Sequence, residues 1–315
     1  MKLKLLMIAA LLASAVALAF GQAPHETFAF VTDAAPNFRL KWDVYLPATQ
    51  GQYPAVLVIF GDRFLGGNRQ QVAGIAAALA SQGFVALAID YRTDEANSYT
   101  GQQVPVYAPP ASPNQPGDVK LAVTAARTGV IPSGHSIIYN WIIPGGKVGA
   151  VGGSAGASHA LWCAATGSLS TDKLDAAVLF SGAYEFDDGA SLIWQPLNCG
   201  YGMTTFCLDV NSYCQVNPAV CSSPIPAALH DGSPIYQVGA DVSPLFWISN
   251  PGDPITPSQF SDLAHLIASL HLDPNVFIGV WLNDQAHYCN HSFDNWSTER
   301  NDVVNWLHAR LDASP

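Results

Sequence analysis

Six short apolar runs, separated by polar loops, set the rhythm of the chain. Each is rich in Val, Ile, Leu and Ala and has the length of a strand buried on both faces of a sheet. The runs are Ala55–Phe60, Val85–Asp90, Lys147–Gly152, Ala176–Phe180, Leu245–Ser249 and Val276–Leu282. Helical stretches alternate with them, at Asn68–Ser81, Val119–Thr128, Ala155–Ala165, Gln259–Leu270 and Glu299–Leu311. This alternation predicts an α/β fold: a mostly parallel central sheet with helices on both faces.

Two segments near the start of the chain have a different pattern. Apolar and polar residues alternate in Phe28–Val31 and again in Arg39–Leu46, where Pro47 ends the run. Alternation with a period of two is typical of a strand with one face in the core. We therefore expect a pair of antiparallel edge strands before the parallel part of the sheet.

The region from Phe186 to Ser243 interrupts the strand–helix rhythm. It contains no clear strand, many Pro, Gly and Asn residues, and four of the six cysteines. An irregular segment of this length inside a compact domain often serves as a lid. Five aromatic residues of the segment either line a pocket beneath it or pack only against one another: Trp194, Tyr201, Phe206, Tyr213 and Tyr236. We expect one domain over residues 22–315, with a cap or lid inserted at about residues 186–243.

The N-terminus has the pattern of a secretory signal peptide. Lys2 and Lys4 precede an apolar run from Leu5 to Phe20, and small residues follow it. The run is short for a full membrane span. Residues 1–21 are therefore expected to be removed, with cleavage near Gly21 or Ala23, which predicts a secreted or periplasmic protein with no membrane attachment.

Composition and charge narrow the classes of partner. The chain has 315 residues, of which 49% are hydrophobic and 12% charged, and a formal net charge of −11. This is the composition of a globular protein, and it argues against a nucleic-acid partner, which requires a basic face. The sequence does not fix the oligomeric state.

The six cysteines suggest disulfides in an exported protein. Cys199 with Cys207 and Cys214 with Cys221 would be local bridges inside the insertion, which would leave Cys163 with Cys289. Other pairings remain open. No Cys-x-x-Cys pair is present, so the spacing does not indicate a zinc site.

One motif carries most of the chemical signal. The residues from Gly152 to Gly156 read Gly-Gly-Ser-Ala-Gly, which is the spacing G-x-S-x-G, directly after a buried strand and at the start of a helix. A sharp strand-to-helix turn of this kind lifts a serine hydroxyl into a pocket, and the glycines avoid collisions with the neighbouring strand and helix. Ser154 is therefore the candidate nucleophile.

A serine nucleophile needs a base, and the base needs an acid that orients it. Ligands of such sheets gather at the carboxyl ends of the strands, where Asp253 follows the run Leu245–Ser249. Asp253 is the candidate acid; Asp241 and Asp284 are weaker alternatives.

The candidate base is a histidine that follows the last strand, because only there do the residues come in the order Ser, Asp, His. His287 lies five residues after Leu282, and His291 is the alternative. His159, on the helix after the serine, is expected to pack in the core.

An oxyanion formed at Ser154 would need backbone N–H donors. The N–H of Ala155, at a helix N-terminus, is one candidate. The loop FGDRFLGGN after the first buried run offers the second, with Asp62 and Arg63 as the best positions.

Taken together, these motifs resemble the α/β-hydrolase superfamily, and more narrowly its carboxylesterase and feruloyl-esterase-like branch, with relatives among hormone-sensitive-lipase-type esterases and dienelactone hydrolases. The resemblance covers about Arg39 to Leu311. It rests on AVLVIFGDRF, LAIDYR, QPGDVKLAV, VGGSAG, PGDPITPSQF and NDQAH, in that order. It implies a serine esterase that works through Ser154, His287 and Asp253 and an acyl-enzyme, with neither metal nor organic cofactor.

The chain departs from this family in two places. The family's usual His-Gly-Gly-Gly loop is replaced by Phe60-Gly61-Asp62-Arg63. The cysteine-rich insertion is the second departure, and because of it the substrates of family members cannot be assigned to this chain. Expected substrates are small or polysaccharide-linked esters. The alternatives are a catalytically weakened hydrolase fold that serves as a binding protein, and a peptidase on the same fold. The peptidase would usually carry an added propeller domain, which the few strands before Ala55 do not provide.

Overall fold

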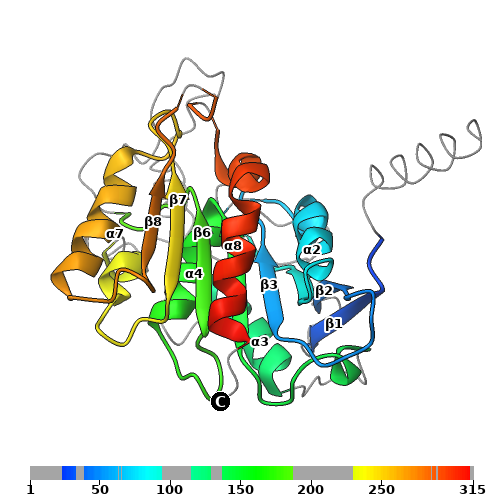
Figure 1. Cartoon of the computed structure of the whole chain (residues 1–315). Coiled ribbons are helices and arrows are strands. Elements are labelled where there is room, and N and C mark those ends of the chain that lie inside the picture. Colours follow the sequence, from blue (N-terminus) through cyan, green and yellow to red (C-terminus); the bar gives the residue numbers. More distant parts are fainter. Residues whose placement is uncertain are drawn as a thin grey trace, which may run out of the picture.

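The centre of the protein is a twisted sheet that runs through the whole molecule (Figure 1). The computed structural model describes residues 23–32, 39–62, 64, 66–93, 115–128, 137–186, 230–284, 286–288 and 290–312. Within these residues the sheet has eight strands in the order β1-β2-β4-β3-β5-β6-β7-β8. Their bounds are β1 Glu26–Thr32, β2 Arg39–Tyr45, β3 Ala55–Ile59, β4 Val85–Ile89, β5 Val148–Gly153, β6 Ala176–Phe180, β7 Leu245–Ser249 and β8 Ile278–Trp281.

The two N-terminal strands are antiparallel, as the alternating pattern predicts, but only one of them lies at an edge. β1 pairs with β2, and β2 also pairs with β4 in antiparallel register, with Trp42 opposite Ile89. β2 is therefore an interior strand, and its side chains are buried on both faces: Trp42 and Val44 on one, Asp43 and Tyr45 on the other. The remaining pairs, from β4–β3 to β7–β8, are parallel.

Helices cover both faces of this sheet, as expected. The α-helices are α2 Ala73–Ala80, α3 Gln115–Thr128, α4 Ala155–Ala165, α7 Pro257–Ser269 and α8 Trp296–Leu311, and a short 3-10 turn, Arg69–Val72, leads into α2. In Figure 1, α2 and α8 lie in front of the sheet and α4 lies behind it. The ring of His308 on α8 stacks on Phe84. Three helices, α3, α7 and α8, begin earlier than the apolar pattern predicts. Pro116 fits the first turn of α3 because it needs no backbone hydrogen bond there.

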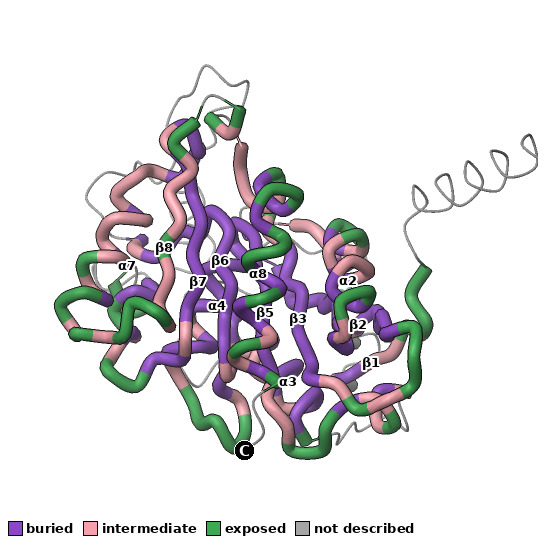
Figure 2. The backbone as a smooth tube through the Cα atoms, viewed as in Figure 1, coloured by how far each residue is buried: buried purple, intermediate pink, exposed green. Residues whose placement is uncertain are grey.

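The core follows the inner strands, and burial decreases toward both edge strands, β1 and β8 (Figure 2). Every residue of β3, β4, β6 and β7 is buried, which explains why these runs contain no alternating polar positions. β8 differs from the prediction. Its residues are only partly buried or exposed because it is the last strand of the sheet.

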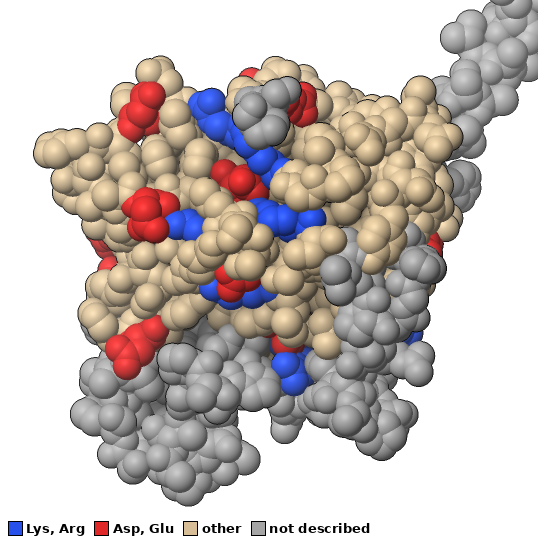
Figure 3. Space-filling model, turned by 90° about the horizontal axis from the view of Figure 1, so that it is seen from below, with Lys and Arg blue, Asp and Glu red and all other residues tan. Residues whose placement is uncertain are grey.

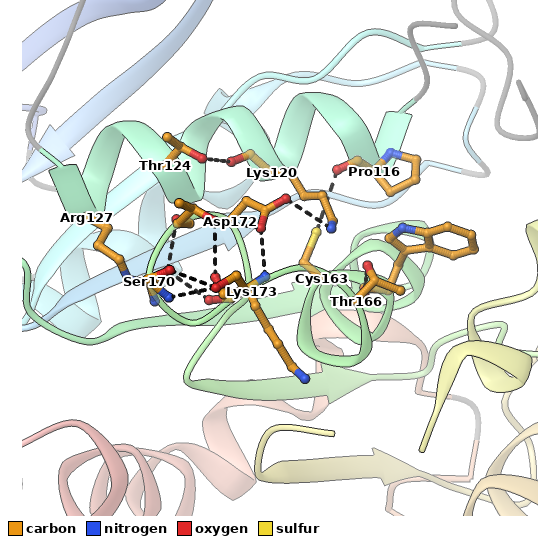
Figure 4. A network of polar contacts seen from close by, with 12 residues as sticks. Pro116, Lys120, Thr124, Arg127, Cys163, Thr166, Ser170, Asp172 and Lys173 are labelled. Carbon is orange, nitrogen blue, oxygen red and sulfur yellow. Dashed lines mark hydrogen bonds and ion pairs between the residues drawn. The ribbon is translucent and has the colours of Figure 1, made fainter. Parts of the chain in front are cut away.

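Ion pairs join the segments at the end of the sheet opposite the strand ends that carry Ser154. Lys120 of α3 pairs with Asp172, and Arg127 donates to the carbonyl of Lys173 (Figure 4). Arg127 also pairs with Asp175. On the face seen from below, basic side chains lie beside acidic ones (Figure 3). This network ties α3 to the loop between α4 and β6.

Cys163 is a free thiol in this structure, so the expected bridge to Cys289 is wrong. Its side chain is fully buried on α4 and donates to the carbonyl of Pro116 (Figure 4), and burial raises the thiol pKa to about 12. Three other parts of the predictions lie outside the described residues: the other five cysteines, the expected signal peptide (residues 1–21), and residues 187–229 of the insertion.

Candidate active site

Ser154, Asp253 and His291 follow three different strands and meet at the carboxyl end of the sheet. Ser154 comes directly after β5, Asp253 lies in the loop after β7, and His291 lies in the loop after β8. Because the carboxyl ends of parallel strands all lie on the same side of the sheet, these loops are brought together although the residues are far apart in the sequence.

Ser154 sits on a strained turn, as the G-x-S-x-G spacing predicts. Its φ is 54° and its ψ −121°, a left-handed conformation that is rare for a residue with a side chain. A Cβ at Gly152 would collide with the backbone of Gly156, and one at Gly156 with the carbonyl of Ile59. The flanking glycines therefore allow the close approach of strand and helix that holds the serine in this conformation.

His291 joins Ser154 to Asp253. Its Nε2 lies 3.0 Å from Ser154 Oγ, and its Nδ1 lies 2.9 Å from Asp253 Oδ1. A carboxylate can only accept, so the proton is on Nδ1, and Nε2 of the neutral ring accepts the Ser154 hydroxyl proton. The hydroxyl–imidazole–carboxylate array has the connectivity that activates a serine nucleophile.

Asp253 is itself held firmly in place. Its side chain is fully buried; Oδ1 also accepts from the backbone N–H of Ile255, and Oδ2 accepts from the Ser249 hydroxyl. The oxygen that faces His291 is thus fixed by a second donor. Asp241, one of the weaker sequence candidates, pairs with Lys173 instead.

The structure does not bring His287 to Ser154; the alternative, His291, lies beside it instead. His287 Nδ1 lies 2.7 Å from Asp284 Oδ1, and Nε2 lies 2.8 Å from the hydroxyl of Thr298 on α8. Backbone bonds from His287 N to Asp284 O and from Asn290 N to His287 O wind this part of the loop into turns. The turns direct the His287 side chain toward α8, and His291, four residues later, is the histidine that reaches Ser154.

The loop after β3 lies against Ser154, where the sequence predicts an oxyanion donor. A Cβ at Gly61 would come within 2.8 Å of both Gly153 O and Ser154 Cβ, so only glycine fits there. Asp62 follows in the left-handed region at φ 72°. Ala155 is the first residue of α4, and its N–H has no acceptor within the helix. Arg63 lies outside the described residues.

A buried polar network, which no sequence motif predicts, supports this loop on the side away from Ser154. The Tyr91 hydroxyl lies 3.1 Å from the carbonyl of Phe60 and 3.0 Å from that of Gly61, and Gln115 Nε2 donates to the carbonyl of Phe64 at 2.9 Å. His159 Nε2 lies 3.1 Å from Gln115 Oε1. The only sequence signal for this network is polar residues beside buried apolar runs.

His159 packs in the core, as expected, and its surroundings keep it neutral. The ring meets Phe64 and Tyr91 edge to face, and burial lowers its pKa to about 3. Burial also raises the pKa of Tyr91 well above its ordinary value, so neither group adds charge behind the loop near neutral pH.

This neutral histidine should make stability depend on pH. The unfolded chain binds a proton on His159 below its ordinary pKa of 6.5, and the folded protein does not until about pH 3. Stability is therefore present above pH 6.5 and is lost as the pH falls. The free energy of unfolding should drop by about 2 kcal/mol from pH 7 to pH 5 through this residue. Urea unfolding of the parent and of His159→Gln at both values measures it: the difference between the two proteins should shrink or invert at pH 5, and parallel pH dependences would contradict the expectation.

No group of three or more His, Cys, Asp or Glu side chains that could bind a metal ion occurs within the described residues. In the same part of the chain, none of the helices combines the length and apolar character required to cross a membrane.

The sheet order and the strained serine turn define an α/β-hydrolase fold. Structures of a solved esterase, in several states, share it over nearly the whole chain. Apo esterase 2 of Thermogutta terrifontis has a TM-score of 0.62 and 18% identity, covering 92% of this chain and 96% of that chain. The sarin-phosphonylated form has a TM-score of 0.65 and 17% identity, covering 93% and 98%. The butyrate-bound form has a TM-score of 0.61 and 18% identity, covering 92% and 96%. No protein-family model and no curated protein matches the sequence.

Proposed function

We propose that the protein is a serine esterase that hydrolyses carboxylic esters through Ser154, His291 and Asp253. The observation that carries the proposal is the array at the strand ends, in which His291 Nε2 lies 3.0 Å from Ser154 Oγ and Nδ1 lies 2.9 Å from Asp253 Oδ1. The fold shared with a solved esterase supports it.

In the proposed reaction, Ser154 Oγ attacks the ester carbonyl carbon while its proton passes to His291 Nε2. The carbonyl oxygen becomes an oxyanion, which the N–H groups of Ala155 and of the Asp62–Arg63 loop would stabilise. His291 then gives the proton to the departing alcohol, which leaves an acyl-enzyme. Water attacks the acyl carbon while His291 Nε2 takes one of its protons, and His291 then returns that proton to Ser154 Oγ as the Ser154–acyl bond breaks and the acid is released. Asp253 holds the ring and stabilises its cation.

The acyl group is proposed to be short. The solved esterase has been captured with butyrate and with propionate, and this chain matches both structures over 92% of its length. We also propose that the protein acts outside the cytoplasm, because residues 1–21 have the signal-peptide pattern.

The direct test is covalent labelling by a fluorophosphonate, combined with hydrolysis of p-nitrophenyl acetate and butyrate. We expect one label per chain on the peptide that contains Ser154, and loss of hydrolysis in proportion to labelling. Ser158 is the matched control, because it is a buried serine one turn further along α4. Ser158→Ala should be labelled like the parent. Failure of the parent to hydrolyse either ester and to accept the label would favour the binding-protein alternative.

A further inference from the structure

Two buried polar side chains that take no part in the proposed chemistry hold the backbone on either side of His291. Ser181 comes directly after β6 and Asn250 directly after β7. β5, β6 and β7 are neighbours, so Ser154, Ser181 and Asn250 lie side by side at the carboxyl ends of three adjacent strands. Both residues are almost completely buried, at 1% and 0% exposure. A buried polar side chain is costly without a hydrogen-bond partner, and each has one in the histidine loop.

Asn250 fixes the residue before His291. Its Nδ2 donates to the backbone carbonyl of Asn290 at 2.8 Å. Its Oδ1 accepts from the N–H of Gly252 at 3.1 Å, and its own carbonyl accepts from the N–H of Asp253. One side chain thus connects the loop of the acid to the loop of the base.

Ser181 fixes the residue after His291. Its Oγ accepts from the backbone N–H of Ser292 at 2.9 Å, and its own N–H bonds to the carbonyl of Ile248 on β7. Ser181 has a φ of 53°, in the left-handed region. A non-glycine residue persists in this strained conformation only where its surroundings require it.

We propose that Asn250 and Ser181 are positioning residues that bracket His291 and set its imidazole between Ser154 and Asp253. The inference rests on the proposed role of His291 as the base. The imidazole is part of a loop whose other anchor, the contact of His287 with Asp284 and Thr298, lies near the surface. Without the two buried contacts the ring would move relative to Ser154 Oγ, and a displacement of about 1 Å can cost about 100-fold in rate.

The strain at Ser181 allows a test that separates activity from stability. Ser181→Ala and Ser181→Gly both remove the acceptor, but only glycine relieves the left-handed conformation. We expect both variants to lose about 10- to 100-fold in kcat for p-nitrophenyl butyrate, with KM within about twofold of the parent. Ser181→Gly should have a higher melting temperature than Ser181→Ala. Asn250→Ala should show the same split between kcat and KM.

Ser243→Ala is the matched control. Ser243 is also buried and donates to a backbone carbonyl, that of Leu174, at the opposite end of the sheet. Its loss should lower the melting temperature and leave kcat unchanged. A kcat within about twofold of the parent in both Ser181 variants, or a kcat loss in all variants that follows the melting temperature, would overturn the proposal.

Nitrogen NMR of the histidine rings keeps this inference distinct from the proposed function. With His291 assigned by comparison with His291→Gln, the parent should show a proton held on Nδ1. The Ser181 and Asn250 variants should show a mixture of the two tautomers. If the parent hydrolyses no ester, the esterase proposal fails. The tautomer of His291 in the parent and in the variants would still test whether Asn250 and Ser181 position its ring. Identical His291 shifts in the parent and the variants would reject it.

Discussion

Replacement of His291 by alanine is expected to lower kcat/KM for a p-nitrophenyl ester by about 10⁴-fold or more, and replacement of His287 by less than about tenfold. The reason is geometric. Only His291 reaches both Ser154 and Asp253, at 3.0 Å and 2.9 Å. The ring nitrogens of His287 are instead hydrogen-bonded to Asp284 and Thr298. The measurement is steady-state hydrolysis of p-nitrophenyl butyrate by both variants and the parent.

The two histidines are matched controls for each other because they lie on the same loop and each has a carboxylate at Nδ1. His287→Ala removes a contact that anchors the loop to α8, so a modest loss is expected. Equal losses in the two variants would mean that the loop, and not the ring of His291, determines the rate. A greater loss for His287→Ala than for His291→Ala would identify His287 as the base, as first expected from the sequence.

The strands and the strained turn at Ser154 were predictable because their signals are local. A run such as Ala55–Ile59 is apolar at every position since both faces are covered, and the turn at Ser154 requires glycines at fixed offsets. The interior position of β2 was not predictable from alternation alone, because its second partner, β4, is some 40 residues further along the chain.

The choice between His287 and His291 depends on contacts between distant segments. The path of the loop is set by Asn250, 40 residues before Asn290, and by Ser181, 111 residues before Ser292. Distance from the end of the strand therefore favoured the nearer histidine, and nothing local revealed the turns that point it away. Similarly, Gln115 supports the loop after β3 through Phe64, 51 residues earlier, which no short motif shows.

Replacement of Asp253 by alanine should lower kcat by about 10³- to 10⁴-fold, and replacement by asparagine by only about 10- to 100-fold. The backbone N–H of Ile255 donates to the same oxygen that faces His291, and the Ser249 hydroxyl lies at the other. An asparagine would therefore keep its carbonyl oxygen toward His291 and place its amide toward Ser249. The tautomer would be retained, and only the charge that stabilises the imidazolium would be lost.

Kinetics of both variants, with Asp284→Asn as the control, measure this split. Asp284 pairs with His287 in the same manner, its pKa lowered by that hydrogen bond, but it is exposed and distant from the array. Its replacement should leave kcat nearly unchanged. If Asp253→Asn were as inactive as Asp253→Ala, the amide would have turned its nitrogen to His291 despite the Ile255 donor, and the orientation of the ring would then outweigh the charge as the main contribution of the acid.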